Sequence, residues 1–325
     1  MRVTHSASWR PLRGKRIAVL GYGSQGRAQA LNMRDAGFAA TVGLPGRSAA
    51  RRAARGDGLT VTVPRRAVAD ADVIFVLAPD HLHGTLYADD IGPHVRPGQM
   101  LVFAHASSIH FGLIKPPPFV DIVLIAPLGP GKRLRELRGL KDGVACFFAV
   151  HQDASRRARP VGLALARAIG CLPAGAIETT FAAEAVGDLF GEQAVLCGGL
   201  GELLTAGVET LIRHGHTPHT AYLECVYQID LIVDLIKSEG LDGMYRRISP
   251  TAAYGAAVAG PKIITPAVCR AMDRMYRQIE SGRFFREWVK TAARQTGPQP
   301  HPKVPSGYRR GEREVLRELG GEEKP

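Results

Sequence analysis

The sequence predicts an α/β domain built on a doubly wound, parallel β-sheet, followed by an all-α domain. Up to about residue 175, short runs rich in Val, Ile and Ala alternate with helical segments, which is typical of parallel sheets. A glycine-rich turn joins the first run to the first helix, and later in the chain long helical segments follow one another with few β-like runs. We therefore expect a first domain over residues 1–179 and a second over residues 180–325.

The β-like runs define the expected sheet in chain order. Each is short and rich in aliphatic or β-branched residues, which favour strands. Strands are expected at residues 16–20, 39–43, 73–78, 100–104, 122–126 and 144–149, with a helix over 27–36 and a proline-rich loop over 115–119.

The second domain is expected to consist of helices. The helical segments cover residues 182–197, 203–214, 220–239 and 266–282. From residue 296 onward Pro, Gly and charged residues dominate, which predicts a C-terminal tail that is loose or wrapped over the surface.

Composition excludes several classes of protein. No apolar stretch reaches the roughly 18 to 20 residues of a membrane helix, and the first 15 residues lack the apolar core of a secretory signal. The formal net charge of +12 comes from scattered arginines without interleaved aromatics, so we expect no nucleic-acid partner. The cysteines form no CxxC pair and predict reduced, mostly buried thiols of a cytoplasmic protein. They are Cys146, Cys171, Cys197, Cys225 and Cys269.

A Gly-x-Gly-x-x-Gly pattern at residues 21–26 lies between the first strand and the first helix. In that context the glycines permit a tight turn and a close approach of the backbone to a pyrophosphate, which the helix N-terminus then binds. The expected coenzyme-binding turn comprises Gly21, Tyr22, Gly23, Ser24, Gln25 and Gly26.

The residues after the second strand distinguish NADP from NAD. An acidic residue there would bind the ribose diol of NAD, but residues 42–46 contain none. Arg47 and Ser48 follow, with Arg51 and Arg52 close behind, and this set suits a 2′-phosphate. We expect NADP(H), while NAD stays open because some of these arginines can be solvated helix residues.

One helical segment carries three carboxylates spaced by four residues, Glu184, Asp188 and Glu192, which therefore share a helical face. Apolar residues fill the rest of the segment, so we expect it to be buried. A buried row of acids requires a hard cation, and oxygen ligands suit Mg²⁺. An exposed acidic stripe without metal is the alternative. Glu224 and Gln228 are again four residues apart on a later helix.

Several motifs together resemble the ketol-acid reductoisomerase family. They are the glycine turn at 21–26, Ala-Pro-Leu-Gly-Pro-Gly at 126–131, Asp-Leu-Phe-Gly-Glu-Gln-Ala-Val-Leu-Cys-Gly-Gly at 188–199 and Leu-Ile-Val-Asp-Leu at 231–235. The similarity extends from about residue 14 to residue 282, and the 188–199 block is specific to that family.

The resemblance implies a Rossmann-type first domain, a knotted helical second domain and a homodimer with shared active sites. It implies NADP(H) at the glycine turn, with Asp80 and His105 beside the coenzyme. His105 corresponds to the family histidine near the nicotinamide, and Ser249 to the serine that touches the substrate carboxylate.

The resemblance also implies one or two Mg²⁺ ions, held by Asp188 and Glu192. Glu224 would join this metal site from the partner subunit, with Gln228 beside it. The implied catalytic side chains are therefore His105, Asp188, Glu192 and Ser249. In the family, magnesium drives a 1,2-alkyl shift in an acetohydroxy acid, and hydride from NADPH reduces the product.

The chain departs from the family pattern around the substrate and the metal. Leu128 stands where the family has Lys, and Gln228 where it has a second metal-binding Glu. Residues 106–110 and 249–255 also differ, and Tyr227 replaces a common His. Because the glycine turn is kept, these changes indicate a remodelled substrate site.

Three interpretations of function follow. The first is a family enzyme of secondary metabolism acting on a small dihydroxy or sulfonium acid, similar to the cyclopropanol-forming members of malleicyprol biosynthesis. The loss of the Lys ammonium at position 128 suits a cationic sulfonium. The second is an ordinary ketol-acid reductoisomerase of branched-chain amino-acid biosynthesis. The third is a non-catalytic NADP-binding protein. Asp188, Glu192 and Glu224 count against it, because buried acids without metal are costly.

Overall fold

The computed structural model of the chain describes residues 2–295 and 301–319. The chain forms two compact units. The first contains the chain up to Asp188 together with Gly282–Gln295, and the second contains Leu189–Ser281 and the described C-terminal segment. Residues 282–295 thus belong to the first unit, although they follow the helical region in sequence.

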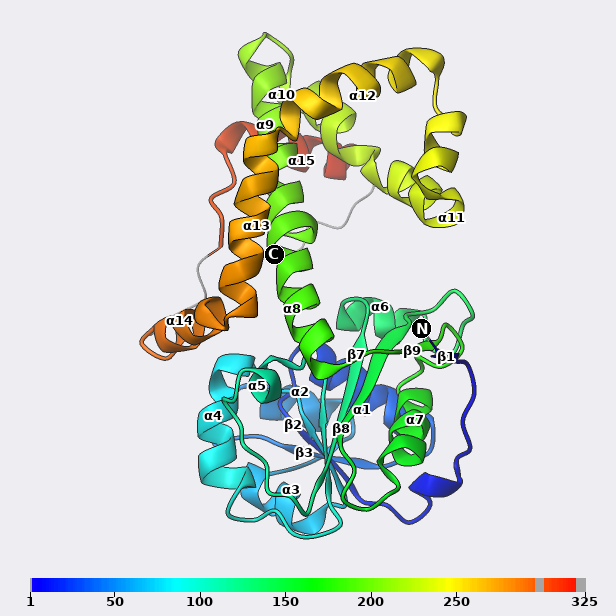
Figure 1. Ribbon diagram of the computed structural model, residues 1–325, viewed down its shortest axis with the longest axis vertical. Coiled ribbons are helices and arrows are strands. Elements are labelled where there is room, and N and C mark those ends of the chain that lie inside the picture. Colours follow the sequence, from blue (N-terminus) through cyan, green and yellow to red (C-terminus); the bar gives the residue numbers. More distant parts are fainter. Residues whose placement is uncertain (1, 296–300, 320–325) are drawn as a thin grey trace. The chain divides into compact units, whose positions relative to one another are not determined.

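A nine-stranded sheet forms the centre of the first unit (Figure 1). Its strand order is β1-β9-β8-β7-β6-β5-β2-β3-β4. The strands are β1 (Val3–Thr4), β2 (Ile17–Leu20), β3 (Ala40–Gly43), β4 (Thr60–Thr62), β5 (Val73–Val76), β6 (Met100–Phe103), β7 (Asp121–Pro127), β8 (Cys146–Gln152) and β9 (Ala176–Glu178).

The strands that the sequence predicts are all present, with ends shifted by a few residues. The expected parallel sheet is correct except for two pairs, because β7 pairs with β8 and β1 pairs with β9 in the antiparallel sense. The sequence analysis missed β1, β4 and β9, which are only two or three residues long and therefore carry too little pattern to be recognised.

The helices of the first unit include α8, whose last three residues belong to the second unit. They are α1 (Ser24–Asp35), α2 (Ala50–Gly56), α3 (Pro64–Asp70), α4 (His83–Leu86), α5 (Ser107–His110), α6 (Gly131–Glu136), α7 (Ala158–Ala168), α8 (Phe181–Gly191) and α14 (Arg283–Ala292), with the short turns η1 (Arg10–Leu12), η2 (Asp80–Leu82) and η3 (Tyr87–Ile91). The region 115–119 is the loop that its prolines predict.

The central strands are buried on both faces, and successive residues alternate between two cores. Val19 and Phe75 belong to the core that α1 and α7 cover, whereas Leu20 and Ile74 belong to the core that includes residues of α3 and α8. Continuous burial explains why these strands are uninterrupted apolar runs. This double packing makes the sheet a rigid base for the loops at its carboxyl edge.

The second unit is helical, as expected. Its elements are α9 (Gly198–Arg213), α10 (Pro218–Tyr222), α11 (Ile229–Arg247), α12 (Pro250–Ile263), α13 (Pro266–Glu280) and α15 (Ser306–Glu318), with the π-helical turns η4 (Glu192–Leu196) and η5 (Leu223–Tyr227). Each π turn interrupts one of the long helices predicted from the sequence.

The C-terminal tail contains a helix that the sequence analysis did not predict. Residues 306–318 form α15, which packs against α9 and α10. A Cβ on Gly311 would lie 2.1 Å from the Pro218 carbonyl oxygen, so this glycine permits the close approach of the two helices. Residues 296–300 and 320–325 of the expected tail lie outside the described residues.

Two burial predictions are wrong for the single chain. Cys146 and Cys171 are buried, but Cys197 and Cys269 are exposed, so the cysteines are not mostly buried. The helix that carries the predicted row of acids was also expected to be buried, but only 6% of the most apolar window of Phe181–Arg213 is buried. The prediction that no apolar stretch reaches the length of a membrane helix is wrong as well, because this stretch is long and apolar enough by length and composition. A single such helix is weak evidence for a membrane span, and its exposure leaves an apolar surface to be explained.

Candidate active site

The glycine turn lies at the point where the strand order reverses. From β2 the chain proceeds to β3 on one side, and β5 pairs with β2 on the other. Open α/β sheets bind ligands in the crevice at such a point. A Cβ on Gly21 would lie 2.5 Å from the Ala78 nitrogen, whereas one on Gly23 would meet nothing within 4 Å. Gly21 therefore packs against the end of β5, and Gly23 leaves open space in front of the N-terminus of α1.

Three side chains attach the glycine turn to α2. The Tyr22 hydroxyl donates to Asp57 Oδ2 at 2.8 Å, and Arg27 donates to both carboxylate oxygens of Asp57, at 2.7 and 2.9 Å. The Arg27 guanidinium lowers the pKa of Asp57 to about 2, against the opposing effect of burial, and the Tyr22 hydrogen bond adds to the lowering. The Asp57 carboxylate is thus charged, and both of its oxygens accept hydrogen bonds.

The loop after β3 carries the residues expected to distinguish NADP from NAD. Arg51 Nη1 donates to the carbonyl oxygens of Leu44, at 2.6 Å, and Thr62, at 3.1 Å, so Arg51 braces the loop. The first carboxylate after β3 is Asp57, which is already paired. Arg47 and Ser48 remain the residues of this loop that suit a 2′-phosphate.

His105 follows β6 and lies between two carboxylates. Its Nδ1 is 3.3 Å from Asp80 Oδ2, which follows β5, and its Nε2 is 3.2 Å from Asp188 Oδ2 on α8. The Ser107 hydroxyl lies 3.1 Å from the same Nε2. Burial disfavours the imidazolium, but the Asp80 hydrogen bond and the charges of Glu184, Asp80 and Asp188 outweigh it and raise the pKa of His105 to about 9. His105 is therefore protonated at neutral pH and can donate from both ring nitrogens.

Glu184 lies one helical turn before Asp188 and is only 3% exposed. Its Oε2 accepts a hydrogen bond of 2.8 Å from the backbone N–H of Ala106. Burial raises the pKa of Glu184 to about 7, although the His105 charge and the Ala106 N–H oppose this. The carboxylate thus holds the backbone beside His105, a contact that the sequence indicates only through the four-residue spacing of Glu184 and Asp188.

His83 is a further buried histidine near this cluster, which the sequence analysis did not single out. Its Nε2 lies 2.8 Å from the Ala78 carbonyl oxygen and its Nδ1 lies 2.8 Å from Ser108 Oγ. The carbonyl can only accept, so Nε2 carries the proton and Nδ1 accepts from the Ser108 hydroxyl. Burial lowers the pKa of His83, which favours this neutral form.

Leu128 lies in the loop between β7 and α6, and its side chain is 49% exposed. Two hydrogen bonds join this loop to the first turn of α1: Gln25 Nε2 donates to the Gly129 carbonyl oxygen at 2.9 Å, and the Gly131 N–H donates to Ser24 Oγ at 3.1 Å. The loop that departs from the family pattern is therefore in contact with the coenzyme turn.

The predicted buried row of acids is wrong for the single chain. Glu184 is buried, but the Asp188 side chain is 43% exposed and Glu192 is exposed. Asp188 ends the first unit and Glu192 belongs to the second. Within the described residues, no group of three or more His, Cys, Asp or Glu side chains is arranged to hold a metal ion.

The remaining predicted site residues lie in the second unit. Glu224 is part of η5, and its Oε2 lies 3.4 Å from Gln228 Nε2. Ser249 is the N-cap of α12, where its Oγ accepts the Ala252 N–H at 3.2 Å. The Ser249 hydroxyl hydrogen can still be donated to a ligand.

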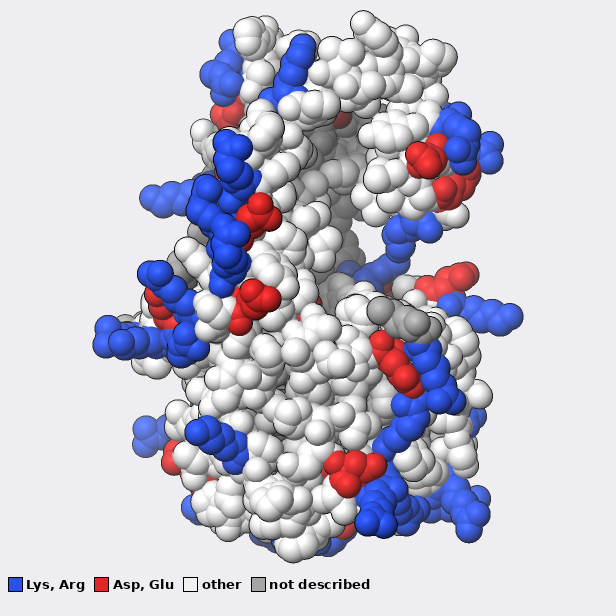
Figure 2. All heavy atoms as spheres, viewed as in Figure 1, with Lys and Arg blue, Asp and Glu red and all other residues white. Residues whose placement is uncertain are grey.

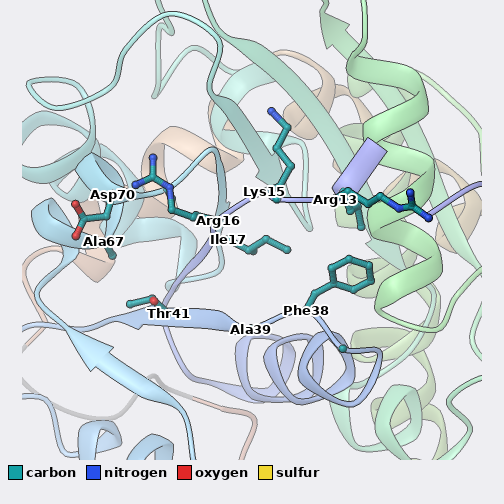
Figure 3. Close-up of a pocket in the computed structure, with 13 residues that line it drawn as sticks. Arg13, Lys15, Arg16, Ile17, Phe38, Ala39, Thr41, Ala67 and Asp70 are labelled. Carbon is teal, nitrogen blue, oxygen red and sulfur yellow. The ribbon is translucent and has the colours of Figure 1, made fainter. Parts of the chain in front are cut away.

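A cavity of about 430 Å³ lies at the opposite, amino edge of the sheet, where β2 begins (Figure 3). Its rim carries Arg13, Lys15 and Arg16, but these side chains point in different directions in Figure 3, and Arg16 already lies 3.5 Å from Asp72. Without converging polar groups, this cavity is not the coenzyme site. Figure 2 shows Lys and Arg side chains at several separate places on one face of the molecule, with Asp and Glu among them.

Comparison with known proteins identifies the two domains of one family in this chain. Residues 11–175 match the model of the acetohydroxy acid isomeroreductase NADPH-binding domain, and residues 181–308 match that of the ketol-acid reductoisomerase C-terminal domain. A solved NADH-preferring ketol-acid reductoisomerase from an uncultured archaean is 37% identical, with a TM-score of 0.86, over 99% of this chain and 95% of that one.

More distant structures share the fold alone. A semialdehyde dehydrogenase NAD-binding protein from Cupriavidus necator, in complex with calcium and NAD, is 19% identical with a TM-score of 0.64, over 85% of this chain and 99% of its own. A putative oxidoreductase from a Jannaschia species is 16% identical with a TM-score of 0.63, over 82% and 97%. The two family models span most of the chain, and the chain is thus a member of the ketol-acid reductoisomerase family of oxidoreductases and isomerases, with an NAD(P)H-binding domain.

Proposed function

We propose that the chain is a Mg²⁺- and NADP(H)-dependent family member whose remodelled site acts on a small dihydroxy or sulfonium acid of secondary metabolism. The observation that carries this proposal is Leu128. An exposed apolar side chain stands beside the coenzyme turn where the family pattern has a lysine. A binding site that loses an ammonium there no longer attracts an anionic group at that place, and it no longer repels a cationic one.

The coenzyme turn suits a dinucleotide. Gly23 leaves open space in front of the N-terminus of α1, where unpaired N–H groups bind pyrophosphate. The expected coenzyme residues Tyr22, Ser24 and Gln25 all lie in this turn, but their side chains bond to Asp57, Gly131 and Gly129, so the backbone of the turn is the part that faces the coenzyme.

NADP is the coenzyme that the loop after β3 favours. No carboxylate there is available for a ribose diol, because Asp57 is paired with Arg27. Arg47 has an exposed side chain at the position where a 2′-phosphate is bound in this fold. The NADH preference of the archaeal relative makes this a specific point to test.

The proposed magnesium ligands are Asp188, Glu192 and Glu224, with the amide oxygen of Gln228. This donor set fits Mg²⁺, because it consists of hard oxygens, although an amide binds more weakly than the carboxylate of the family pattern. When bound, magnesium supplies Lewis acidity and orients substrate oxygens. Of the chain's own groups, His105 holds a proton at Nε2, beside Asp188, and Asp80 keeps the ring in place.

The proposed partner is a second copy of this chain. On α11 and α12, Leu231 is 63% exposed and Tyr254 is 74% exposed, and none of the fourteen residues of α12 is buried. Figure 2 shows the surface over α12 with few charged side chains. Isolated apolar helices of this kind need a covering surface. A homodimer provides one for α11, α12 and the exposed stretch of Phe181–Arg213, and it supplies Glu224 of the partner subunit to the metal site.

The narrower form of the proposal is cyclopropanol formation from a dihydroxy sulfonium acid. One hydroxyl is oxidised to a ketone by hydride transfer to NADP⁺, and a carbon beside the ketone loses a proton. That carbon forms a C–C bond as a C–S bond breaks and a dialkyl sulfide leaves. The same hydride equivalent, from NADPH, then reduces the ketone, so the reaction needs no net oxidant. Leu128 provides an uncharged wall that does not repel the sulfonium.

A second candidate is ordinary ketol-acid reductoisomerase activity, which the 37% identity and near-complete overlap with the archaeal enzyme favour. The decisive comparison uses the Leu128→Lys/Gln228→Glu double variant, with Leu140→Lys as a control on an exposed leucine elsewhere. If the protein is an ordinary enzyme weakened by these two substitutions, the double variant gains at least about tenfold in turnover of 2-acetolactate with NADPH.

The remodelled site predicts a different outcome, because residues 106–110 and 249–255 also differ from the family pattern. The double variant stays inactive on 2-acetolactate, while the wild type, supplied with NADP⁺, releases a dialkyl sulfide from a dihydroxy sulfonium acid or oxidises a related small dihydroxy acid. A wild type that is inactive on that panel but turns over 2-acetolactate contradicts the proposal. Calorimetry without Mg²⁺ binding in the presence of NADPH instead supports the non-catalytic interpretation.

A further inference from the structure

The first turn of α1 and the loop that carries Leu128 are joined by a row of polar contacts. Besides the Gln25–Gly129 and Ser24–Gly131 hydrogen bonds, Asn32 Nδ2 donates to the Leu134 carbonyl oxygen at 3.2 Å. Further along the helix, Arg135 donates to Asn32 Oδ1 at 2.7 Å and forms an ion pair of 2.5 Å with Asp35. One side of α1 is therefore bonded to the loop and to α6 over its whole length.

The two segments also approach too closely for side chains. A Cβ on Gly131 would lie 2.1 Å from the Ser24 carbonyl oxygen and 2.5 Å from the Ser24 carbonyl carbon. Because the obstacle is backbone, a substitution cannot be accommodated by a side-chain rotation. The loop and the coenzyme turn are thus in direct backbone contact at this point.

The orientation of the Gln25 side chain follows from its partners. The Gly129 carbonyl can only accept, so the Gln25 amide nitrogen must face it. Gln25 Oε1 then accepts from Gln29 Nε2 at 3.1 Å, and Gln29 Oε1 is left buried without a partner among the described residues. An unpaired buried acceptor is unfavourable, so the orientation is maintained by the contact that Gln25 makes with the loop.

We propose that Gln25 is a positioning residue for the Leu128 loop, and that its side-chain amide determines where residue 128 lies relative to the coenzyme turn. Gln25 acts through Gly129 and not through the coenzyme. The inference rests on the proposed function only in taking residue 128 as part of the substrate site. It implies that substrate selection depends on a side chain of the glycine-turn motif itself.

The test is hydrogen–deuterium exchange of the full-length protein over residues 127–132, combined with the NADPH dissociation constant. Gln25→Met removes the donor at similar side-chain length, and Gln25→Lys restores a donor. The control is Gln152→Met, because Gln152 Nε2 also donates to backbone carbonyls, those of Pro117 and Val120, at a place away from α1.

We expect exchange over 127–132 to be about fivefold to tenfold faster in Gln25→Met, which corresponds to one lost hydrogen bond, and to return to within about twofold of the wild type in Gln25→Lys. The NADPH dissociation constant is measured on the same variants, because a lost coenzyme contact would raise it without changing exchange over 127–132. Gln152→Met should leave this segment unchanged. If Gln25→Lys restores slow exchange, the effect of Gln25→Met comes from the lost hydrogen-bond donor and not from a general loss of packing.

The inference is overturned if Gln25→Met leaves exchange over 127–132 unchanged, or if Gln25→Lys fails to restore it. A loss of NADPH affinity of tenfold or more with unchanged exchange would identify Gln25 as a coenzyme ligand instead. If the wild type binds no NADPH, the proposed function fails, but the exchange measurement on the free protein still decides the role of Gln25.

Discussion

The two units of the chain differ in how far their apolar residues are buried within the single chain. In the first, the strands β2, β5 and β6 are buried throughout, and the sheet is covered on both faces. In the second, α11 buries only Gly243 and Met244, and α12 buries nothing. The first unit is thus complete within one chain, whereas the second has helices that need a further surface.

The candidate site residues of the two units also differ in the contacts that they make within the chain. In the first unit, the candidate site residues Asp80, His105, Asp188 and Glu184 contact one another or the adjacent backbone. In the second unit, Glu224 and Gln228 are exposed and contact each other only weakly. The difference teaches that the residues around His105 form their contacts within one chain, whereas the proposed metal ligands of the second unit would need the proposed homodimer to complete a site.

The largest expected effect comes from charging the apolar surface of the second unit. Leu231→Asp should weaken association of the homodimer by at least about a hundredfold, because a carboxylate would be buried against apolar side chains. Sedimentation velocity over a range of protein concentrations measures this. Leu140→Asp is the control, since Leu140 is 53% exposed but lies in the first unit. A wild type that is monomeric, or a Leu231→Asp variant that stays dimeric, contradicts the contrast between the units.

The next largest effect concerns the close contact between α1 and α6 in the first unit. Gly131→Ala should lower the free energy of unfolding by about 3 kcal/mol, because its Cβ would meet the Ser24 backbone at 2.1 Å. Gly129→Ala is the matched control, since its Cβ would meet only Val144, at 3.5 Å. Chemical denaturation followed by circular dichroism gives both values. Equal stability of the two variants would mean that the α1–α6 contact is not as close as described.

A smaller effect concerns the coenzyme. Arg47→Ala should weaken NADPH binding by about tenfold, or about 1.4 kcal/mol, and leave NADH binding unchanged, because only the former carries a 2′-phosphate. Arg55→Ala provides the control, as an exposed arginine of α2. Fluorescence titration measures all four constants. If Arg47→Ala weakens both coenzymes equally, the arginine does not distinguish between them.

The smallest effect is a pH dependence of the first unit. Asp57 has a pKa of about 2 in the folded chain, below its ordinary value of 3.8, so its contribution to stability is complete above pH 4 and is lost as the pH falls toward 2. Asp57→Asn should therefore cost about 1 kcal/mol at neutral pH, an amount reduced by partial exposure, and only a small fraction of that near pH 2. Thermal unfolding of both proteins from pH 2 to 7 tests this. A difference that does not shrink with acid would assign the stabilisation to another cause.

The sequence predicts the parts of the fold that repeat locally. Buried strands such as 73–76 are continuous apolar runs, and the glycine turn has the spacing of a dinucleotide-binding turn between a strand and a helix. The ends of β5 and β6 lie side by side in a parallel sheet, which explains why Asp80 and His105 meet although 25 residues separate them.

The contacts that escaped prediction join residues distant in sequence. Gln25 and Gly129 are 104 positions apart, and no local pattern links them. The burial of Glu184 but not of Glu192 also could not be read from their common spacing, because it depends on which unit covers each turn of the helix. The role of α15 was missed because its composition is polar and its packing uses a glycine.

The central claim is that the substrate site has been remodelled while the coenzyme site is kept. The most direct test is nicotinamide absorbance with the purified wild type, Mg²⁺, NADPH and 2-acetolactate, after binding of NADPH and Mg²⁺ has been shown by calorimetry. We expect the wild type to bind both without consuming NADPH. Consumption at about 1 per second or faster would contradict it and identify a working ketol-acid reductoisomerase.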